Sequence, residues 1–341
     1  MTSVPPPPGS AWPRSSSGSP SPGARPARRR ATARPARIAV VQPGNVTGPE
    51  RRFDANVELT RESRARTLDL VVWGESSVAF DEDPESSWQP ELEELSAAVE
   101  APLLVNVDAR RGEGGIFKSS VLVDAAGVEG RYDKMRLVPF GEYVPLRPLF
   151  GWVTAVTDAP EEDRRRGPGL ETLDVDGFTI GPLVCFESAF PDLTRLLADD
   201  GADVVVVQSA TTTFQGSWAQ PQHASLGAVR AVESGRPVVH AAVSGTTAAF
   251  DADGNRLAWL PSDETRSVVV PVALSTRTTP FVRWGDWVPV LCAALLLGAV
   301  SAALIRSRRS TWHGDGRDVS ATPSDGDAHR EPIGKRPSPD S

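Results

Sequence analysis

Short apolar runs alternate with stretches of helical periodicity through the middle of the chain. The runs are bounded by glycine, proline, asparagine or aspartate, which is typical of strands, and they predict strands at residues 38–42, 68–73, 103–107, 119–123, 179–184, 203–207 and 237–243. Apolar residues at helical spacing predict helices at residues 51–67, 90–99 and 219–234, with a further helix opening at residues 190–192. Strands separated by helices indicate an α/β fold in which helices cover a sheet.

The last part of this region predicts how the sheet closes. Residues 246–250 and 267–272 have strand patterns on either side of a turn at residues 253–255, and we expect them to form a closing antiparallel edge. The four valines at residues 204–207 indicate a strand that is buried on both faces. A four-layer α-β-β-α arrangement fits this pattern, and so does a three-layer one, because periodicity alone does not distinguish them.

The two ends of the chain are polar tails. Residues 1–37 are rich in proline, serine and arginine, and residues 306–341 are also polar. Segments of this composition bury too little apolar surface to fold, so we predict disorder for both. The folded domain is therefore expected at residues 38–280, followed by a distinct segment at residues 281–305.

That distinct segment predicts one membrane span. Residues 287–305 are apolar throughout and are about long enough to cross a bilayer. Trp284 and Trp287 stand at one border, as interfacial tryptophans do, and Arg306 begins a basic cluster at the other. A buried core helix is the alternative, but it does not need such borders. The positive-inside rule places the arginines in the cytoplasm and the folded domain on the outer side of the cell membrane.

Composition excludes several classes of function. The net charge is −8 over 341 residues, and the acidic excess lies between the two tails, which argues against a nucleic-acid partner. The two cysteines, Cys185 and Cys292, do not make a disulfide framework. The four histidines are His223, His240, His313 and His329. None of them pairs with another at metal-ligand spacing, so we predict neither a metal nor a cofactor.

Three chemically useful side chains follow predicted strands. Glu75 follows an apolar run, Lys134 follows residues 131–133, and Cys185 follows the strand at residues 179–184. Each alone has an ordinary explanation, as a capping carboxylate, a surface lysine and a core cysteine. Together they supply a base, a cation and a nucleophile, because a thiol needs a base and a tetrahedral intermediate needs a positive group for its oxyanion.

The position of Cys185 adds to this hypothesis. It lies between the end of a strand and the start of a helix, where α/β folds place reactive groups. The N–H groups of a helix terminus favour a thiolate, so we expect them to lower the pKa of Cys185.

Four segments resemble the carbon–nitrogen hydrolase, or nitrilase, superfamily, and more closely the catalytic domain of the apolipoprotein N-acyltransferases. They are residues 72–76 (VWGES), 132–145 (YDKMRLVPFGEYVP), 185–187 (CFE) and 279–287 (TPFVRWGDW). The second segment is highly specific, and the fourth, just before an apolar span, separates the acyltransferases from soluble nitrilases. The resemblance covers about residues 38–305 and implies a four-layer α-β-β-α sandwich, followed here by the transmembrane helix.

The resemblance also implies roles for individual residues. Glu75 matches the general base, Lys134 the oxyanion stabiliser and Cys185 the nucleophile. Glu142 and Glu187 match supporting glutamates near the lysine and the cysteine. The residues expected to line the substrate site are Trp73, Phe186 and Phe214.

Some positions depart from the family pattern. Glycine stands at residue 74 where proline is frequent, and Phe186 stands where tyrosine is frequent. An expected Tyr-Asn-Ser is replaced by residues 117–119 (FKS), and an aromatic-rich segment by residues 210–214 (ATTTF). We expect these positions to shape substrate recognition.

The implied reaction is transfer of an acyl chain from a phospholipid, through a thioester on cysteine, to the N-terminal amine of a lipoprotein. Its partners are then the phospholipid acyl donor, the apolipoprotein N-terminus and the membrane. A membrane-tethered amidase or nitrilase, with water as the acceptor, is the alternative. Because the acyltransferases carry several membrane helices before the catalytic domain, a third hypothesis is the catalytic half of a split enzyme with a separate multi-span subunit.

Overall fold

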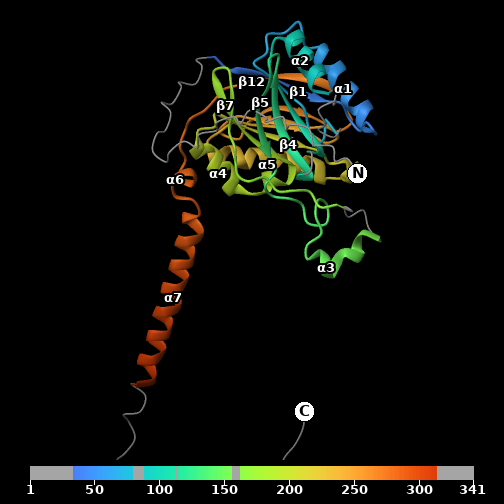
Figure 1. The fold of residues 1–341 in the computed structure, drawn as a ribbon. Coiled ribbons are helices and arrows are strands. Elements are labelled where there is room, and N and C mark those ends of the chain that lie inside the picture. Colours follow the sequence, from blue (N-terminus) through green and yellow to red (C-terminus); the bar gives the residue numbers. More distant parts are fainter. Residues whose placement is uncertain (1–33, 80–87, 112–113, 156–161, 313–341) are drawn as a thin grey trace, which may run out of the picture. The chain divides into compact units, whose positions relative to one another are not determined.

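The computed structural model describes residues 34–79, 88–111, 114–155 and 162–312 (Figure 1). The predicted tails fall mainly at residues 1–33 and 313–341, outside these ranges. Contacts divide the chain into two units, residues 1–285 and residues 286–341.

The first of two sheets has six strands, in the order β12-β1-β2-β3-β4-β5. Their bounds are β1 Ala36–Gln42, β2 Leu70–Val72, β3 Leu103–Arg110, β4 Ile116–Asp124, β5 Gly127–Asp133 and β12 Arg266–Val272. Strands β1, β2 and β3 are parallel to one another, whereas β4 is antiparallel to β3 and β5 is antiparallel to β4. Strand β5 therefore runs in the same direction as β2.

The second sheet also has six strands, in the order β11-β10-β9-β8-β7-β6. Their bounds are β6 Leu173–Val175, β7 Phe178–Val184, β8 Val204–Ser209, β9 Val238–Ala242, β10 Thr247–Phe250 and β11 Arg256–Leu260. The three central strands, β7, β8 and β9, are parallel. The valines of β8 are fully buried, as their composition predicts.

Three apolar clusters define four layers. One cluster lies between the sheets and joins residues such as Ile38 and Leu104 to Ile180 and Val206. The other two lie on the outer faces. Helices α1 (Pro49–Arg61) and α2 (Trp88–Val99) pack on the first sheet, and helices α4 (Pro191–Asp200) and α5 (Ala219–Ser234) pack on the second. The fold is thus the four-layer α-β-β-α sandwich (Figure 1).

The predicted closing edge is wrong in one respect. Strand β10 pairs with β9 and β11 in the second sheet, whereas β12 pairs with β1 in the first. The chain crosses from the second sheet to the first after β11. As a result β12, the last strand of the first unit, pairs with β1, its first strand. Strands β6 and β11 were not predicted, and of β5 only the end at residues 131–133 was expected, because these strands are short or partly exposed and carry polar residues.

The topology brings the carboxyl ends of several strands to one edge of the sandwich. Strands β2, β3 and β5 end there in the first sheet, and the antiparallel β4 begins there. The sheets approach closely at this edge. A Cβ added to Gly74 would lie 2.4 Å from the backbone nitrogen of Val243, so no side chain fits there. Gln208 ties the sheets together by donating to the carbonyl oxygens of Trp73 and Leu104.

The second unit begins just after α6 (Pro280–Trp284) and contains α7 (Trp287–Trp312). Among the described residues, α7 is the one helix long and apolar enough to cross a membrane. This stretch is Trp287–Ser307, with a mean hydropathy of 2.5. The predicted apolar span is therefore a helix in the structure.

Candidate active site

Glu75 lies in a turn directly after β2, at the edge where the strand ends meet. Its side chain is buried, and its Oε2 accepts a hydrogen bond of 3.0 Å from the backbone N–H of Ala210, which follows β8. Its own N–H donates to the carbonyl oxygen of Ser209. The carboxylate is therefore held from both sheets.

Lys134 enters the same site from the end of β5. It is almost fully buried, and its ammonium nitrogen lies 2.7 Å from Oε1 of Glu142 and 3.3 Å from Oε1 of Glu75. Glu142 is itself fixed, because its Oε2 accepts a hydrogen bond of 2.8 Å from the N–H of Val138. These contacts hold the ammonium of Lys134 beside Glu142.

Cys185 follows β7 and opens the 3₁₀ turn η3 (Cys185–Ala189). Its φ of 50° places it in the left-handed region, which costs about 1–3 kcal/mol for a residue with a side chain. Its carbonyl oxygen lies 3.2 Å from Nε2 of His223 and accepts a hydrogen bond of 2.9 Å from the hydroxyl of Ser188. The hydroxyl of Ser209 faces its sulfur at 3.8 Å. These contacts support the strained backbone and direct the thiol into the site.

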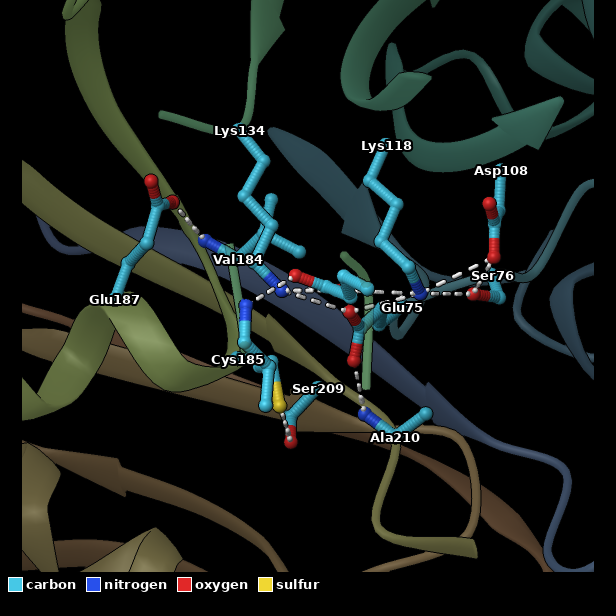
Figure 2. Close-up of polar contacts among 12 residues, drawn as sticks. Glu75, Ser76, Asp108, Lys118, Lys134, Val184, Cys185, Glu187, Ser209 and Ala210 are labelled. Carbon is cyan, nitrogen blue, oxygen red and sulfur yellow. Dashed lines mark hydrogen bonds and ion pairs between the residues drawn. The ribbon is translucent and has the colours of Figure 1, made fainter. Parts of the chain in front are cut away.

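Figure 2 shows the side chains of Glu75, Lys134 and Cys185 converging from three strand ends. Burial raises the pKa of Glu75, but the charges of Lys118 and Lys134 outweigh burial and lower it to about 2. Burial, together with the charge of Glu75, raises the pKa of Cys185 to about 12. At neutral pH the resting site therefore holds an ionised carboxylate beside a thiol that still carries its proton.

The expected low pKa of Cys185 is thus wrong in direction. Helix α4 begins at Pro191, and a 3₁₀ turn separates Cys185 from it, so the helix N–H groups do not reach the sulfur. Burial of the thiol and, after it, the charge of Glu75 raise the pKa of Cys185 instead.

The raised pKa of Cys185 predicts a pH profile for alkylation. Only the thiolate reacts with iodoacetamide, and its fraction rises tenfold per pH unit as long as the pH is below the pKa. In a Cys292→Ser protein, where Cys185 is the remaining thiol, the alkylation rate should keep rising through pH 9.5. A plateau near pH 8.5, the usual range of a free cysteine, would contradict the assignment.

Glu187 joins the loop that carries Lys134 to the strand that carries Cys185. It is fully buried, and its Oε1 accepts hydrogen bonds from the Tyr132 hydroxyl at 2.8 Å, the Met135 N–H at 2.8 Å and the Arg136 N–H at 3.0 Å. Its Oε2 accepts from the N–H of Val184 at 2.9 Å. Glu187 therefore fixes the distance between the segment that carries Lys134 and the strand that precedes Cys185.

The residues predicted to line the substrate site have different positions. Trp73 is fully buried on the outer side of the first sheet, where its ring packs edge-on against Phe53 and its Nε1–H donates to Thr60. It is a core residue, and its predicted substrate contact is wrong. Phe186 is half-buried beside Cys185 and packs edge-on against Phe190. Phe214 is exposed in a short turn after Ala210.

Two more residues lie at the site: Lys118, which was expected only to shape substrate recognition, and His223, which was given no role. Lys118, in β4, lies 3.1 Å from Oε1 of Glu75. His223, in α5, contacts the carbonyl oxygen of Cys185, and its Nδ1 lies 3.3 Å from the hydroxyl of Ser209. The sequence signal for Lys118 was a lysine inside an otherwise strand-like segment, which usually indicates an exposed face. His223 lies within a predicted helix, and nothing in that pattern marks it as a site residue.

A cavity of about 230 Å³ opens beside Glu75. Its lining includes the polar side chains of Arg52, Ser76, Asp108 and Lys118. Within the described ranges, no group of three or more His, Cys, Asp and Glu side chains has an arrangement suited to a metal ion. The chemistry proposed below uses side chains alone.

Comparison with known proteins links this geometry to one family. The model of the carbon-nitrogen hydrolase family matches residues 37–279. The apolipoprotein N-acyltransferase of Azotobacter vinelandii is 32% identical over 287 residues, which make up 80% of this chain and 54% of that protein. That of Pseudomonas syringae is 31% identical over 248 residues, or 71% of this chain and 48% of that protein. The chain spans about half the length of the curated relatives it matches.

Solved structures share the fold at lower identity. An amidase of the nitrilase superfamily from Nesterenkonia AN1 superposes with a TM-score of 0.55 at 19% identity, over 70% of this chain and 91% of that one. A carbon-nitrogen hydrolase from Helicobacter pylori superposes with a TM-score of 0.56 at 15% identity, over 70% and 88%. Both likenesses concern the fold.

Proposed function

The chain belongs to the carbon–nitrogen hydrolase family, and from this premise we propose that it transfers an acyl chain from a phospholipid to the N-terminal amine of a lipoprotein. The observation that carries the proposal is the convergence of Glu75, Lys134 and Cys185 in one buried site. The relatives named apolipoprotein N-acyltransferase favour this acceptor over water.

In the first half of the cycle, the Cys185 sulfur attacks the ester carbonyl of the phospholipid. Glu75 takes the thiol proton as the carbon–sulfur bond forms, because the raised pKa of the thiol makes prior ionisation unfavourable. Lys134 stabilises the oxyanion of the tetrahedral intermediate. The ester C–O bond then breaks, Glu75 gives its proton to the departing alkoxide, and an acyl thioester and a lysophospholipid result.

In the second half, the neutral amine of the lipoprotein attacks the thioester. Glu75 takes a proton from the attacking nitrogen, and Lys134 again holds the oxyanion. The C–S bond breaks, Glu75 returns the proton to the sulfur, and an amide leaves. The thiol of Cys185 is restored, so the cycle needs only the two substrates.

Several features support a membrane setting. Helix α7 has the length and composition of a span, and we propose that it anchors the chain in the cell membrane with the catalytic domain on the outer side. Large apolar side chains are exposed on the two segments that leave the site. One segment follows Glu142 and carries Leu149 and Trp152, and the other follows Ala210 and carries Phe214 and Trp218. Exposed aromatic side chains of this kind suit a lipid surface.

The partners follow from this cycle: a phospholipid acyl donor, an apolipoprotein N-terminus and the membrane. We also propose a separate multi-span membrane subunit as a partner that completes the lipid site. Co-purification of an integral membrane protein with the full chain would test this part.

The proposed function predicts N-acylation in cells. Expressed in cells deficient in lipoprotein N-acylation, the chain should convert a lipoprotein's free N-terminal amine to an amide, and the Cys185→Ala variant should not. Mass spectrometry of the lipoprotein N-terminus is the measurement. A Cys292→Ser variant is the matched control and should acylate normally, because Cys292 lies in α7.

The same experiment distinguishes the amidase alternative. The amidase and the acyltransferase differ only in whether water or an amine attacks the thioester. Free lipoprotein amines throughout, combined with hydrolysis of simple amides by the purified protein, would favour the amidase and contradict acyl transfer.

A further inference from the structure

Lys118 points into the active site from the amino end of β4 (Figure 2). Its ammonium nitrogen lies 3.1 Å from Oε1 of Glu75 and 3.1 Å from Oδ2 of Asp108. It also lies 3.8 Å from Oε1 of Glu142 and donates a hydrogen bond of 3.0 Å to the hydroxyl of Ser76. Its side chain is only 11% exposed. This lysine is therefore part of a buried polar cluster and not of a solvated strand face.

Two ammonium groups meet one oxygen in this cluster. Oε1 of Glu75 lies 3.1 Å from Lys118 and 3.3 Å from Lys134, while Oε2 accepts the N–H of Ala210. Two cations this close together repel each other unless carboxylates compensate them. Glu75, Glu142 and Asp108 supply that compensation, and the guanidinium of Arg164 pairs with Asp108 at 3.3 Å.

The choice of residue also fits this geometry. The chain has 36 lysines and arginines together, of which Lys118, Lys134 and Lys335 are the lysines. Both lysines in the described ranges stand in this site. A compact ammonium can share one carboxylate oxygen with a second ammonium, whereas a planar guanidinium spreads its donors over a wider fork.

The cavity beside Glu75 explains what a second cation does there. Lys118, Asp108 and Ser76 line this space of about 230 Å³, which is large enough for several water molecules. Without Lys118, Lys134 would be the one ammonium left at Oε1, and the carboxylate could turn toward water in the cavity. The contact from Lys118 prevents the carboxylate from turning in this way.

We propose that Lys118 is a positioning residue of the active site, which clamps Oε1 of Glu75 so that the carboxylate stays ionised and turned toward Cys185. The inference rests on the proposed roles of Glu75 and Cys185, and it extends them by one residue. Lys118 acts through Glu75 and need not touch the substrate.

The charges that face Glu75 give the sign of the effect. Lys118 comes from β4, Lys134 follows β5, Cys185 follows β7, and Arg52 of α1 lies across the cavity. After burial, which raises the pKa of Glu75, the charge of Lys118 is the largest influence and lowers it. Removing that charge should therefore raise the pKa of Glu75 toward its usual value of about 4.3.

The test uses an activated ester that needs no lipid-binding surface. The full chain with Cys292→Ser is mixed with p-nitrophenyl butyrate, and the burst of total p-nitrophenol released by acylation of Cys185 is followed between pH 3.5 and 8, with Cys185→Ala as the blank. Lys118→Met should slow acylation at pH 7 by about 10- to 100-fold, as is typical when a group that orients a catalytic side chain is lost. Its rate should also fall below about pH 5, whereas the parent rate stays level to lower pH.

Two further variants separate positioning from structure. Lys118→Arg keeps the positive charge and should restore the acid limit of the parent and part of the rate. Lys118→Gln keeps a hydrogen-bond donor without the charge and should behave like Lys118→Met in its pH profile. Arg277→Gln is the matched control, because it removes an exposed cation that pairs with Asp253 outside this cluster, and it should change the rate less than threefold.

Two outcomes would overturn the proposal. In one, Lys118→Met and Lys118→Gln acylate at the parent rate. In the other, they slow acylation while the acid limit stays in place and Lys118→Arg gives no rescue. The proposed function is tested separately, because a chain that fails to N-acylate lipoproteins can still show the shifted acid limit in the ester assay.

Discussion

Glu75→Gln should abolish acylation of Cys185 while making the same thiol easier to alkylate. Glutamine cannot accept the thiol proton, so the acylation rate should fall by about 10²–10⁴-fold, the usual contribution of a general base. Its neutral side chain also removes the negative charge that raises the pKa of Cys185. More thiolate is then present at pH 8, and iodoacetamide should react several-fold faster.

The opposite directions of these two effects make the prediction specific. A variant that had merely lost its fold would lose its cooperative thermal transition. Acylation by p-nitrophenyl butyrate and alkylation by iodoacetamide are measured on the same Cys292→Ser preparation. If both rates fall together in a folded Glu75→Gln protein, the carboxylate is a structural group and not the base.

Glu187→Ala should cause the largest loss of stability among the site residues. It leaves the Tyr132 hydroxyl and the N–H groups of Met135, Arg136 and Val184 without their acceptor in a fully buried place. Losing the centre of such a network costs about 3–5 kcal/mol. For a domain of this size, the melting temperature of the full chain should fall by roughly 10 °C.

Matched variants set the scale for this prediction. Tyr132→Phe removes one of the four donors and should cost only about 1 kcal/mol. Glu129→Ala, at an exposed position of β5, should leave the melting temperature within about 1 °C. If Glu187→Ala has the same melting temperature as Glu129→Ala, the four hydrogen bonds do not hold the loop of Lys134 against the strand of Cys185.

Much of the fold could be predicted because its central strands are strongly apolar. The runs that became β1, β2, β7 and β8 are nearly free of polar residues, and each is buried between layers. The destination of β12 could not be predicted in the same way. Its alternating pattern fits either sheet, and only the pairing with β1 decides between them.

The site was predictable where residue type and strand end coincide. Glu75, Lys134 and Cys185 each follow a strand, and parallel strand ends meet at one edge. Lys118 escaped this reasoning because it lies within a strand that runs the other way and therefore begins at that edge. The substrate contact expected of Trp73 fails because its side chain packs into the outer cluster of the first sheet, while Glu75, two positions later, already lies in the turn after β2.

The raised pKa of Cys185 could not be predicted from local sequence. It depends first on burial of the thiol and then on the charge of a carboxylate 110 positions earlier in the chain, and both arise only in the packed sandwich. The N–H groups of the following helix, considered alone, predict a lowered pKa for Cys185.

The central claim is that the acyl chain passes through Cys185. The most direct test incubates the full chain with phospholipid vesicles, without an acceptor, and then stops the reaction with acid and digests the protein. Mass spectrometry should find the peptide with Cys185 carrying one acyl chain that hydroxylamine removes, and that mass should disappear when a lipoprotein amine is added. Acyl transfer to the amine with the Cys185 peptide never modified, or with the acyl chain on Cys292 instead, would contradict the account.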